Sequence, residues 1–216
     1  MQVFDFDNGI EASPGWSTGG GDPMTYAFTK KEGSTTSIGT GPSAGVGGSG
    51  PYVYAETSSP REQGDLFTLT YDGSACSDTG LGVSTVTFYY HMYGAAMGKL
   101  RVTNAAGGVA WSLSGDQGDS WNATTVDIYS PSFAFEYTRG SSWQGDAAVA
   151  LVGVSCGAGP PPPSPSPPPS SPSPLPPPSP KPPSPKSPPA APPSPLACAD
   201  KPKEKCKKNK YGPCGK

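Results

Sequence analysis

The chain contains a single histidine, His91, within the stretch FYYHMYGAAMGKLRV. A histidine acts in catalysis only beside a nucleophile or carboxylate, and a zinc site needs further ligands, usually more histidines. The sequence shows no G-x-S-x-G elbow and no reactive-cysteine signature. We therefore expect His91 to be a strand residue or part of a binding surface, and we do not expect an enzyme.

Three cysteines near the C-terminus, Cys198, Cys206 and Cys214, follow the spacing C-x7-C-x7-C. An odd number leaves one thiol unpaired, which is typical of a small disulfide module that has been cut. Its Cys-x-Asp start and later Gly-x-Cys resemble the beginning of a ShK-toxin-like domain. Zinc binding by three widely spaced cysteines without histidine is the weaker alternative.

Composition divides the chain into three parts: a mixed globular domain over residues 1–157, a Pro/Ser-rich linker over 158–196 and a Cys-rich tail over 197–216. Charge divides similarly. Residues 1–180 carry 6 Lys and Arg against 15 acids, a charge of −9, and residues 181–216 carry 9 Lys against 2 acids, a charge of +7. An acidic front domain argues against nucleic-acid binding.

The linker is dominated by proline, which makes up 22 of the 36 residues from Pro160 to Pro195. Proline lacks the amide donor that helices and sheets require, so we expect a disordered or polyproline II segment, roughly 110 Å long if straight. The SPPP and SPSP repeats resemble the hydroxyproline-rich glycoproteins of plant and green-algal walls. The alternative is a ligand for SH3 or WW domains, which bind PxxP segments.

Alternating apolar and polar residues recur throughout residues 1–156. In the segment 85–92, Val86, Phe88, Tyr90 and Met92 alternate with a set that includes His91. KLRVT and SFAFEYT repeat the pattern, and turn-forming stretches such as YDGS, NAAGG and SGDQGD separate the segments. Such runs predict half-buried antiparallel strands, so the fold class is all-β, most simply a sandwich of two sheets.

Five motifs, in order, resemble the MAM domain family (named for meprin, A-5 protein and receptor phosphatase mu). They are FDFD, GPYVYAETSSPREQGD, FYYHMYGAAMGKLRV, WSLSGDQGDSW and RGSSWQGDAAVALVGVSC. The resemblance covers nearly all of residues 3–156. It implies a jelly-roll-like antiparallel β-sandwich that takes part in recognition or adhesion and has no catalysis of its own.

The cysteines depart from the family pattern. Phe4 replaces the first family cysteine, and Thr85 stands where the mid-domain cysteine belongs. The resemblance therefore implies that Cys76, nine residues before Thr85, takes the place of the mid-domain cysteine and pairs with Cys156. Two separate buried thiols are the alternative.

Some MAM domains bind a cation through carboxylates. The matching or nearby acids here are Asp7, Glu56 and Asp146, but Ala150 and Leu151 replace the closing acidic pair. A Ca²⁺ site needs six to eight oxygen ligands. We expect no cofactor. We also expect these acids to be solvated at the surface and not to form a site for Ca²⁺ or another cation.

Strand phase and loop position suggest a contact surface of Tyr89, His91, Tyr93 and Trp143, although a loop tryptophan such as Trp143 is more often folded back on the sandwich. Trp111 and Trp121 are expected to fill the core. Asn122 opens a glycosylation sequon, Asn-Ala-Thr. We expect the partner to be an extracellular protein or glycan, including a second copy of the domain.

These features together predict a secreted, cell-surface or cell-wall recognition protein. The sequence shows no signal peptide and no apolar run long enough to span a membrane, so we expect the N-terminus to be incomplete. Two alternatives remain open at this point: an accessory domain of a secreted enzyme such as a metalloprotease, and a lectin-like glycan binder.

Overall fold

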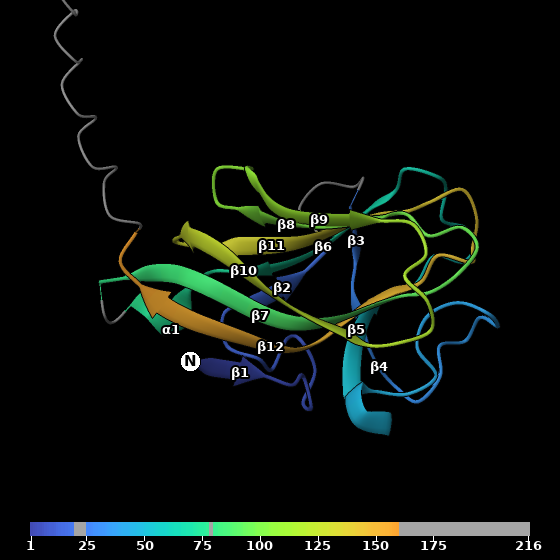
Figure 1. Ribbon diagram of the computed structural model, residues 1–216, viewed down its shortest axis with the longest axis horizontal. Coiled ribbons are helices and arrows are strands. Elements are labelled where there is room, and N and C mark those ends of the chain that lie inside the picture. Colours follow the sequence, from blue (N-terminus) through green and yellow to red (C-terminus); the bar gives the residue numbers. More distant parts are fainter. Residues whose placement is uncertain (20–24, 78–79, 160–216) are drawn as a thin grey trace, which may run out of the picture. The chain divides into compact units, whose positions relative to one another are not determined.

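Twelve strands form two stacked sheets in the computed structural model, which describes residues 1–19, 25–77 and 80–159 (Figure 1). In the first sheet the order is β10-β7-β12-β5-β4, and β1 also pairs with β12. The first sheet comprises β1 (Gln2–Phe4), β4 (Thr29–Glu32), β5 (Pro51–Ala55), β7 (Gly82–Met92), β10 (Asn122–Ser130) and β12 (Ala147–Gly157).

In the second sheet the order is β2-β6-β11-β8-β9, and β3 also pairs with β6. The pairing of β3 with β6 is parallel, and the other pairs of both sheets are antiparallel. The second sheet comprises β2 (Trp16–Thr18), β3 (Thr25–Ala27), β6 (Leu66–Tyr71), β8 (Lys99–Asn104), β9 (Val109–Ser114) and β11 (Phe133–Thr138).

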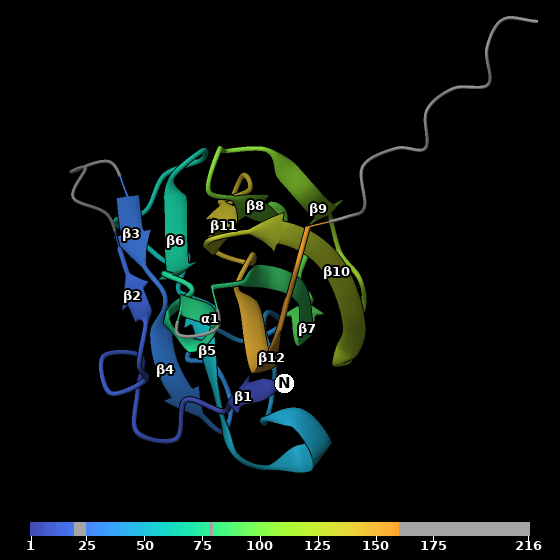
Figure 2. The same cartoon turned by 90° about the vertical axis from the view of Figure 1, so that its left-hand side faces the viewer.

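The predicted all-β sandwich is confirmed. Helical structure within the described part of the chain is limited to the 3₁₀ turn η1 (Val46–Gly48) and the short α1 (Ser74–Ser77). Figure 2, turned by 90°, shows the two layers of strands facing each other. No helix of the described ranges is both long and apolar enough to cross a membrane.

The core forms where the inward faces of the two sheets meet. Phe88 of β7 and Phe135 of β11 belong to opposite sheets, and their ring centroids lie 4.8 Å apart in an edge-to-face arrangement. The alternation of β11 is as predicted, with Phe133, Phe135 and Tyr137 buried. Such burial of large aromatic side chains is the main source of stability in a sandwich of this kind.

Phe4, which stands where the family has a cysteine, is a core residue. Its ring centroid lies 5.5 Å from that of Trp16 and 5.3 Å from that of Tyr71. The space near the start of the chain is thus filled by aromatic packing.

The predicted disulfide between Cys76 and Cys156 is present, with a sequence separation of 80 residues and 5.4 Å between the Cα atoms. It joins α1 to the last strand, β12. The alternative of two separate thiols is therefore wrong. The linker, 158–196, and the tail with Cys198, Cys206 and Cys214 lie outside the described residues, apart from residues 158 and 159.

Candidate binding surface

Five loops meet at one end of the sandwich, on the right in Figure 1. We call this surface the loop end. It comprises residues 33–50, 56–65, 93–98, 115–121 and 139–146, which connect β4–β5, β5–β6, β7–β8, β9–β10 and β11–β12.

Hydrogen bonds between loops hold the loop end together. Thr40 is the centre of one set, since its hydroxyl donates to the carbonyl of Tyr93 at 3.0 Å and accepts from the amide of Asp146 at 2.8 Å. The amide of Gly41 also donates to the Tyr93 carbonyl, at 2.9 Å. Three loops far apart in sequence are therefore fixed to one another.

Close packing of two of these loops depends on Gly94. Its φ is +145°, and a Cβ at this position would lie 2.4 Å from the carbonyl oxygen of Gln144. A side chain here would push the 93–98 loop away from the 139–146 loop.

Asp146 is fully buried beneath these loops. Its Oδ1 accepts from both the amide and the hydroxyl of Thr57, each at 2.9 Å, whereas Oδ2 has no hydrogen-bond partner among the described residues. Burial raises the pKa of Asp146 to about 6, although the hydrogen bonds from Thr57 act in the opposite direction. Asp146 thus acts as a buried crosslink between the β5–β6 and β11–β12 loops.

Glu56 lies near Asp146 but in a different setting. Burial disfavours its charge, yet hydrogen bonds from Ser58, Thr36 and Tyr54 lower its pKa below the ordinary value. Its carboxylate is therefore charged at neutral pH and satisfied by these donors.

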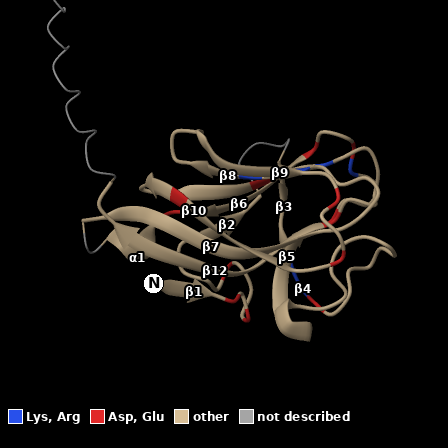
Figure 3. Ribbon diagram, in the orientation of Figure 1, with Lys and Arg blue, Asp and Glu red and all other residues tan. Residues whose placement is uncertain are grey.

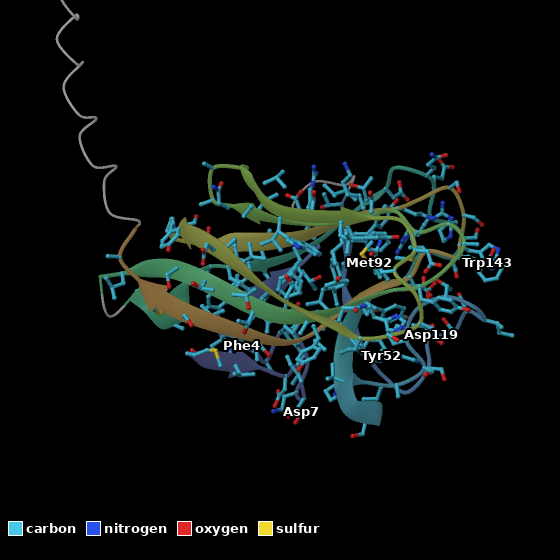
Figure 4. All side chains as sticks on the ribbon, viewed as in Figure 1. Phe4, Asp7, Tyr52, Met92, Asp119 and Trp143 are labelled. Atoms are coloured by element: carbon cyan, nitrogen blue, oxygen red, sulfur yellow. A yellow bond between two sulfur atoms is a disulfide. The ribbon has the colours of Figure 1, made fainter. Side chains whose placement is uncertain are left out.

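The three acids considered for a cation do not come together. Asp7 is an exposed residue whose carbonyl accepts from Lys30 of β4, and Figure 4 places it away from Asp119 and Trp143. Among the described residues, no group of three or more His, Cys, Asp or Glu side chains is arranged to hold a metal ion. The set Asp7, Glu56 and Asp146 is therefore wrong as a three-carboxylate site, because Asp7 belongs to a different part of the sandwich.

The prediction that His91 belongs to an exposed contact surface is wrong. It lies on the face of β7 opposite Phe88, as the alternation predicts, but it is only 2% exposed and does not form an outer surface. Trp121 covers it, with ring centroids 5.4 Å apart, and the indole Nε1 donates to the carbonyl of Ala44. Trp121 therefore packs on the outside of the first sheet, next to a small cluster that contains Tyr52 and Tyr54, and not in the main core.

The only hydrogen bond of the His91 ring within the described residues joins Nε2 to Oδ1 of Asp119, at 3.1 Å. Burial lowers the pKa of His91, although the carboxylates of Asp119 and Asp116 oppose this effect. His91 is therefore neutral near pH 7 and donates to Asp119, while its buried Nδ1 has no partner in the described ranges. The bond to His91 positions the Asp119 carboxylate.

Asp119 and Tyr93 form part of the wall of a hollow of about 270 Å³ at the loop end. Segment 34–43, which follows β4, supplies the rest of the lining. Sequence reasoning missed Asp119 and this segment. The only signal for Asp119 was the turn-forming stretch GDQGD of the fourth motif, and Asp119 follows His91 by 28 residues along the chain.

Two large apolar side chains on the loops of the loop end are exposed: Ile38 at 88% and Trp143 at 44%. Ile38 lines the hollow itself, and the carbonyl of Trp143 accepts from the Thr57 hydroxyl, which ties its loop to the others. Trp143 was expected to fold back on the sandwich, with an exposed contact as the alternative, and the structure shows the partly exposed side chain of that alternative. Figure 3 shows that acidic residues, with a few basic ones, lie along the same loops.

The remaining two predicted contact residues, Tyr93 and Tyr89, lie in different parts of the domain. Tyr93 is half-buried at the loop end, whereas Tyr89 lines a separate depression on the outer face of β7 and β10, together with Thr87, Thr125 and Leu151. Trp111 packs against Phe88 and Tyr90 at the margin of the core, as expected.

Asn122, the residue of the glycosylation sequon, is the first residue of β10 and is half-buried. Its side-chain amide donates to the carbonyl of Ser120.

The model of the family described as "MAM domain, meprin/A5/mu" matches residues 4–156. The chain belongs to the MAM domain family. A human MAM domain-containing glycosylphosphatidylinositol anchor protein 1 is 39% identical over 125 residues, which cover 51% of this chain and 12% of that protein. The mouse anchor protein 2 is 34% identical over 156 residues, which cover 63% of this chain and 16% of that protein. The chain thus spans less than a fifth of the length of these MAM relatives.

Solved structures with the same fold include the K1 cleaved adhesin domain of Lys-gingipain from Porphyromonas gingivalis W83. It aligns with a TM-score of 0.50 at 16% identity and covers 73% of this chain and 98% of that one. The K2 cleaved adhesin domain of Lys-gingipain gives the same TM-score at 14% identity, with 71% and 98% covered. At these identities the likeness concerns the fold alone.

Proposed function

We propose that this MAM domain is a non-catalytic recognition and adhesion module of a secreted, cell-surface or cell-wall protein, and that it contacts its partner through the loop end. The observation that carries the proposal is the exposure of Ile38 and Trp143 on loops that are tied together beside a hollow. Exposed aromatic and aliphatic anchors on a rigid frame are typical of protein contact sites.

The extracellular location rests on two further observations. The Cys76–Cys156 disulfide persists in oxidising compartments, such as the outside of the cell. The relatives named above are glycosylphosphatidylinositol anchor proteins by name. On this proposal, the Pro/Ser-rich segment 158–196 acts as a spacer between the MAM domain and the Cys-rich tail.

The test uses the full 216-residue chain, oxidised and assembled as fluorescent tetramers, and measures binding to intact cells and to beads coated with the same chain. The variant Ile38→Ser/Trp143→Ser removes both exposed anchors of the loop end. We expect binding to fall by about tenfold or more, because truncation of an interface anchor costs at least ~1–2 kcal/mol.

The matched control is Val109→Ser/Tyr129→Ser, which removes two comparably exposed apolar side chains outside the loop end. This control should bind like the wild type. Equal loss in both variants, or no loss in the loop-end variant, would assign recognition to another surface. Binding to the coated beads identifies a second copy of the domain as a partner, whereas binding to cells alone identifies a different one.

A further inference from the structure

We propose that the hollow lined by segment 34–43, Tyr93 and Asp119 is a subsite for one ring of a neutral sugar, a hexopyranoside at the end of a glycan. The inference rests on the proposed function, because it gives recognition by the loop end a chemical class of ligand.

The walls of the hollow are fixed by hydroxyl groups that bond within the protein. The Thr35 hydroxyl donates to the carbonyl of Thr40 at 2.7 Å, and the Ser37 and Ser58 hydroxyls lie 3.0 Å apart. Thr40 is itself bonded to Tyr93, as described above. The hollow is therefore a preformed shape whose lining loops are crosslinked, which reduces the entropic cost of binding.

Two residues that line the hollow, Tyr93 and Asp119, carry polar side-chain groups. The hydrogen bond between Asp119 and His91 uses Oδ1, so Oδ2 is not engaged by that bond. The side chain of Asp119 is 56% exposed, and its Oδ1 is held by the buried ring of His91. The bond to a buried ring consequently fixes the orientation of the Asp119 carboxylate, and Asp119 is one of the residues that line the hollow.

This combination matches the chemistry of a sugar. An ionised carboxylate is an acceptor with several lone-pair positions, so it binds the hydroxyl groups of a diol without competition from its own donors. The ring of Tyr93, together with Ile38 and Pro42, offers apolar surface for the C–H groups of a pyranose. Sites of this type are usually apolar clefts with a few placed polar groups.

The charge and the size of the hollow restrict the class of sugar that it can bind. The lining of the hollow includes the carboxylate of Asp119 and no lysine or arginine. A uronic acid, sialic acid or sulfated sugar would bring a second negative charge beside Asp119, which is unfavourable. A volume of about 270 Å³ is slightly below the usual range for ligand sites, so one ring fits better than a longer chain.

The experiment is an NMR titration of the full, oxidised chain with the methyl glycosides of glucose, galactose and mannose, and with methyl glucuronide as the charged comparison. We expect saturable shifts for at least one neutral glycoside, confined to amides of segment 34–43 and to residues around Tyr93 and Asp119. The glucuronide should bind at least ~10-fold more weakly.

Two variants test the assigned groups. Asp119→Asn keeps an acceptor for His91 but removes the charge, and Tyr93→Ala removes the ring; each should weaken binding about tenfold or more. Asp127→Asn changes another aspartate, which accepts from Thr85 on the outer face of the first sheet, and should bind like the wild type. Thermal unfolding midpoints show whether each variant is folded. The chemical-shift changes of the wild type locate the binding site even if a variant does not fold.

The proposal is wrong if no neutral glycoside gives saturable shifts, if the shifts map to another surface, or if Asp119→Asn binds normally. These failures differ from failure of the proposed function. Cell binding that requires Ile38 and Trp143 but is unaffected by methyl glycosides and by Asp119→Asn would assign the loop end to a protein ligand and overturn the sugar subsite alone. Cell binding that does not require Ile38 and Trp143 would overturn the proposed function.

Discussion

The buried ring of His91 and the half-exposed carboxylate of Asp119, 28 residues later in the chain, form a hydrogen-bonded pair with 3.1 Å between Nε2 and Oδ1. The pair joins the end of β7 to the β9–β10 loop. It therefore links a residue of the sheet to the wall of the hollow at the loop end.

The first prediction concerns the stability that this pair provides. Asp119→Ala removes the one partner that the described part of the chain gives to the buried His91 ring, because Nδ1 has none there. We expect the free energy of unfolding to fall by about 1–3 kcal/mol, the usual cost of an unsatisfied buried polar group. Asp119→Asn keeps an acceptor oxygen, so its free energy of unfolding should fall by less than half of the decrease seen for Asp119→Ala. Urea denaturation measures both, and equal stability of the alanine and asparagine variants would contradict the assigned bond.

The second prediction concerns the pH dependence caused by Asp146. Its folded-state pKa is raised from 3.8 to about 6, so between these pH values the native state binds more protons than the unfolded state. The contribution of this group to stability is therefore present in full below about pH 4 and is lost as the pH rises through 6, by up to about 3 kcal/mol.

Asp146→Asn provides the comparison, because its amide oxygen still accepts from Thr57 and the side chain no longer titrates. The difference in unfolding free energy between the variant and the wild type should grow in favour of the variant from pH 4 to pH 7. Groups that do not interact with Asp146, such as His91, contribute equally to both proteins and cancel in the difference. Glu56 does interact with Asp146, but its pKa is lowered below the ordinary value, so most of its titration lies below the range compared. Parallel stability curves over this range would show that Asp146 is not the titrating group.

The third prediction concerns the disulfide. Replacing both Cys76 and Cys156 with serine opens a loop of 80 residues, and the chain-entropy model gives a loss of about 4 kcal/mol. The wild type treated with a reducing agent should show a similar decrease in its denaturation midpoint. If the oxidised protein and the serine variant unfold at the same denaturant concentration, the crosslink does not stabilise the domain.

The strands were largely predictable because alternation is a local property. Phe133, Phe135 and Tyr137 point inward as the sequence predicts, and His91 lies on the face opposite Phe88. The burial of His91 was not predictable in the same way. It depends on Trp121, which reaches the outer face from another loop and is held there by a bond to Ala44.

The site was less predictable than the fold because its residues come from five separate loops. Asp146 and Trp143 were found in one motif, but the contribution of segment 34–43 has no signature beyond its glycines, prolines and hydroxyls. Asp7 was chosen by resemblance to a family pattern, and the structure places it beside Lys30. Strand alternation does not specify which loops meet at the end of a sandwich.

The central claim is that the loop end is the recognition surface, and an added glycan tests it most directly. Ile38→Asn creates an N-glycosylation sequon with Gly39 and Thr40 at the exposed tip of the 33–50 loop, and Asp72→Asn creates a control sequon with Gly73 and Ser74 beside α1. Both proteins are secreted from eukaryotic cells, their occupancy is established by mass, and tetramer binding to intact cells is measured. We predict that the glycan at the loop end abolishes binding and that the glycan beside α1 leaves it unchanged. Undiminished binding of the fully glycosylated Ile38→Asn protein would contradict the claim.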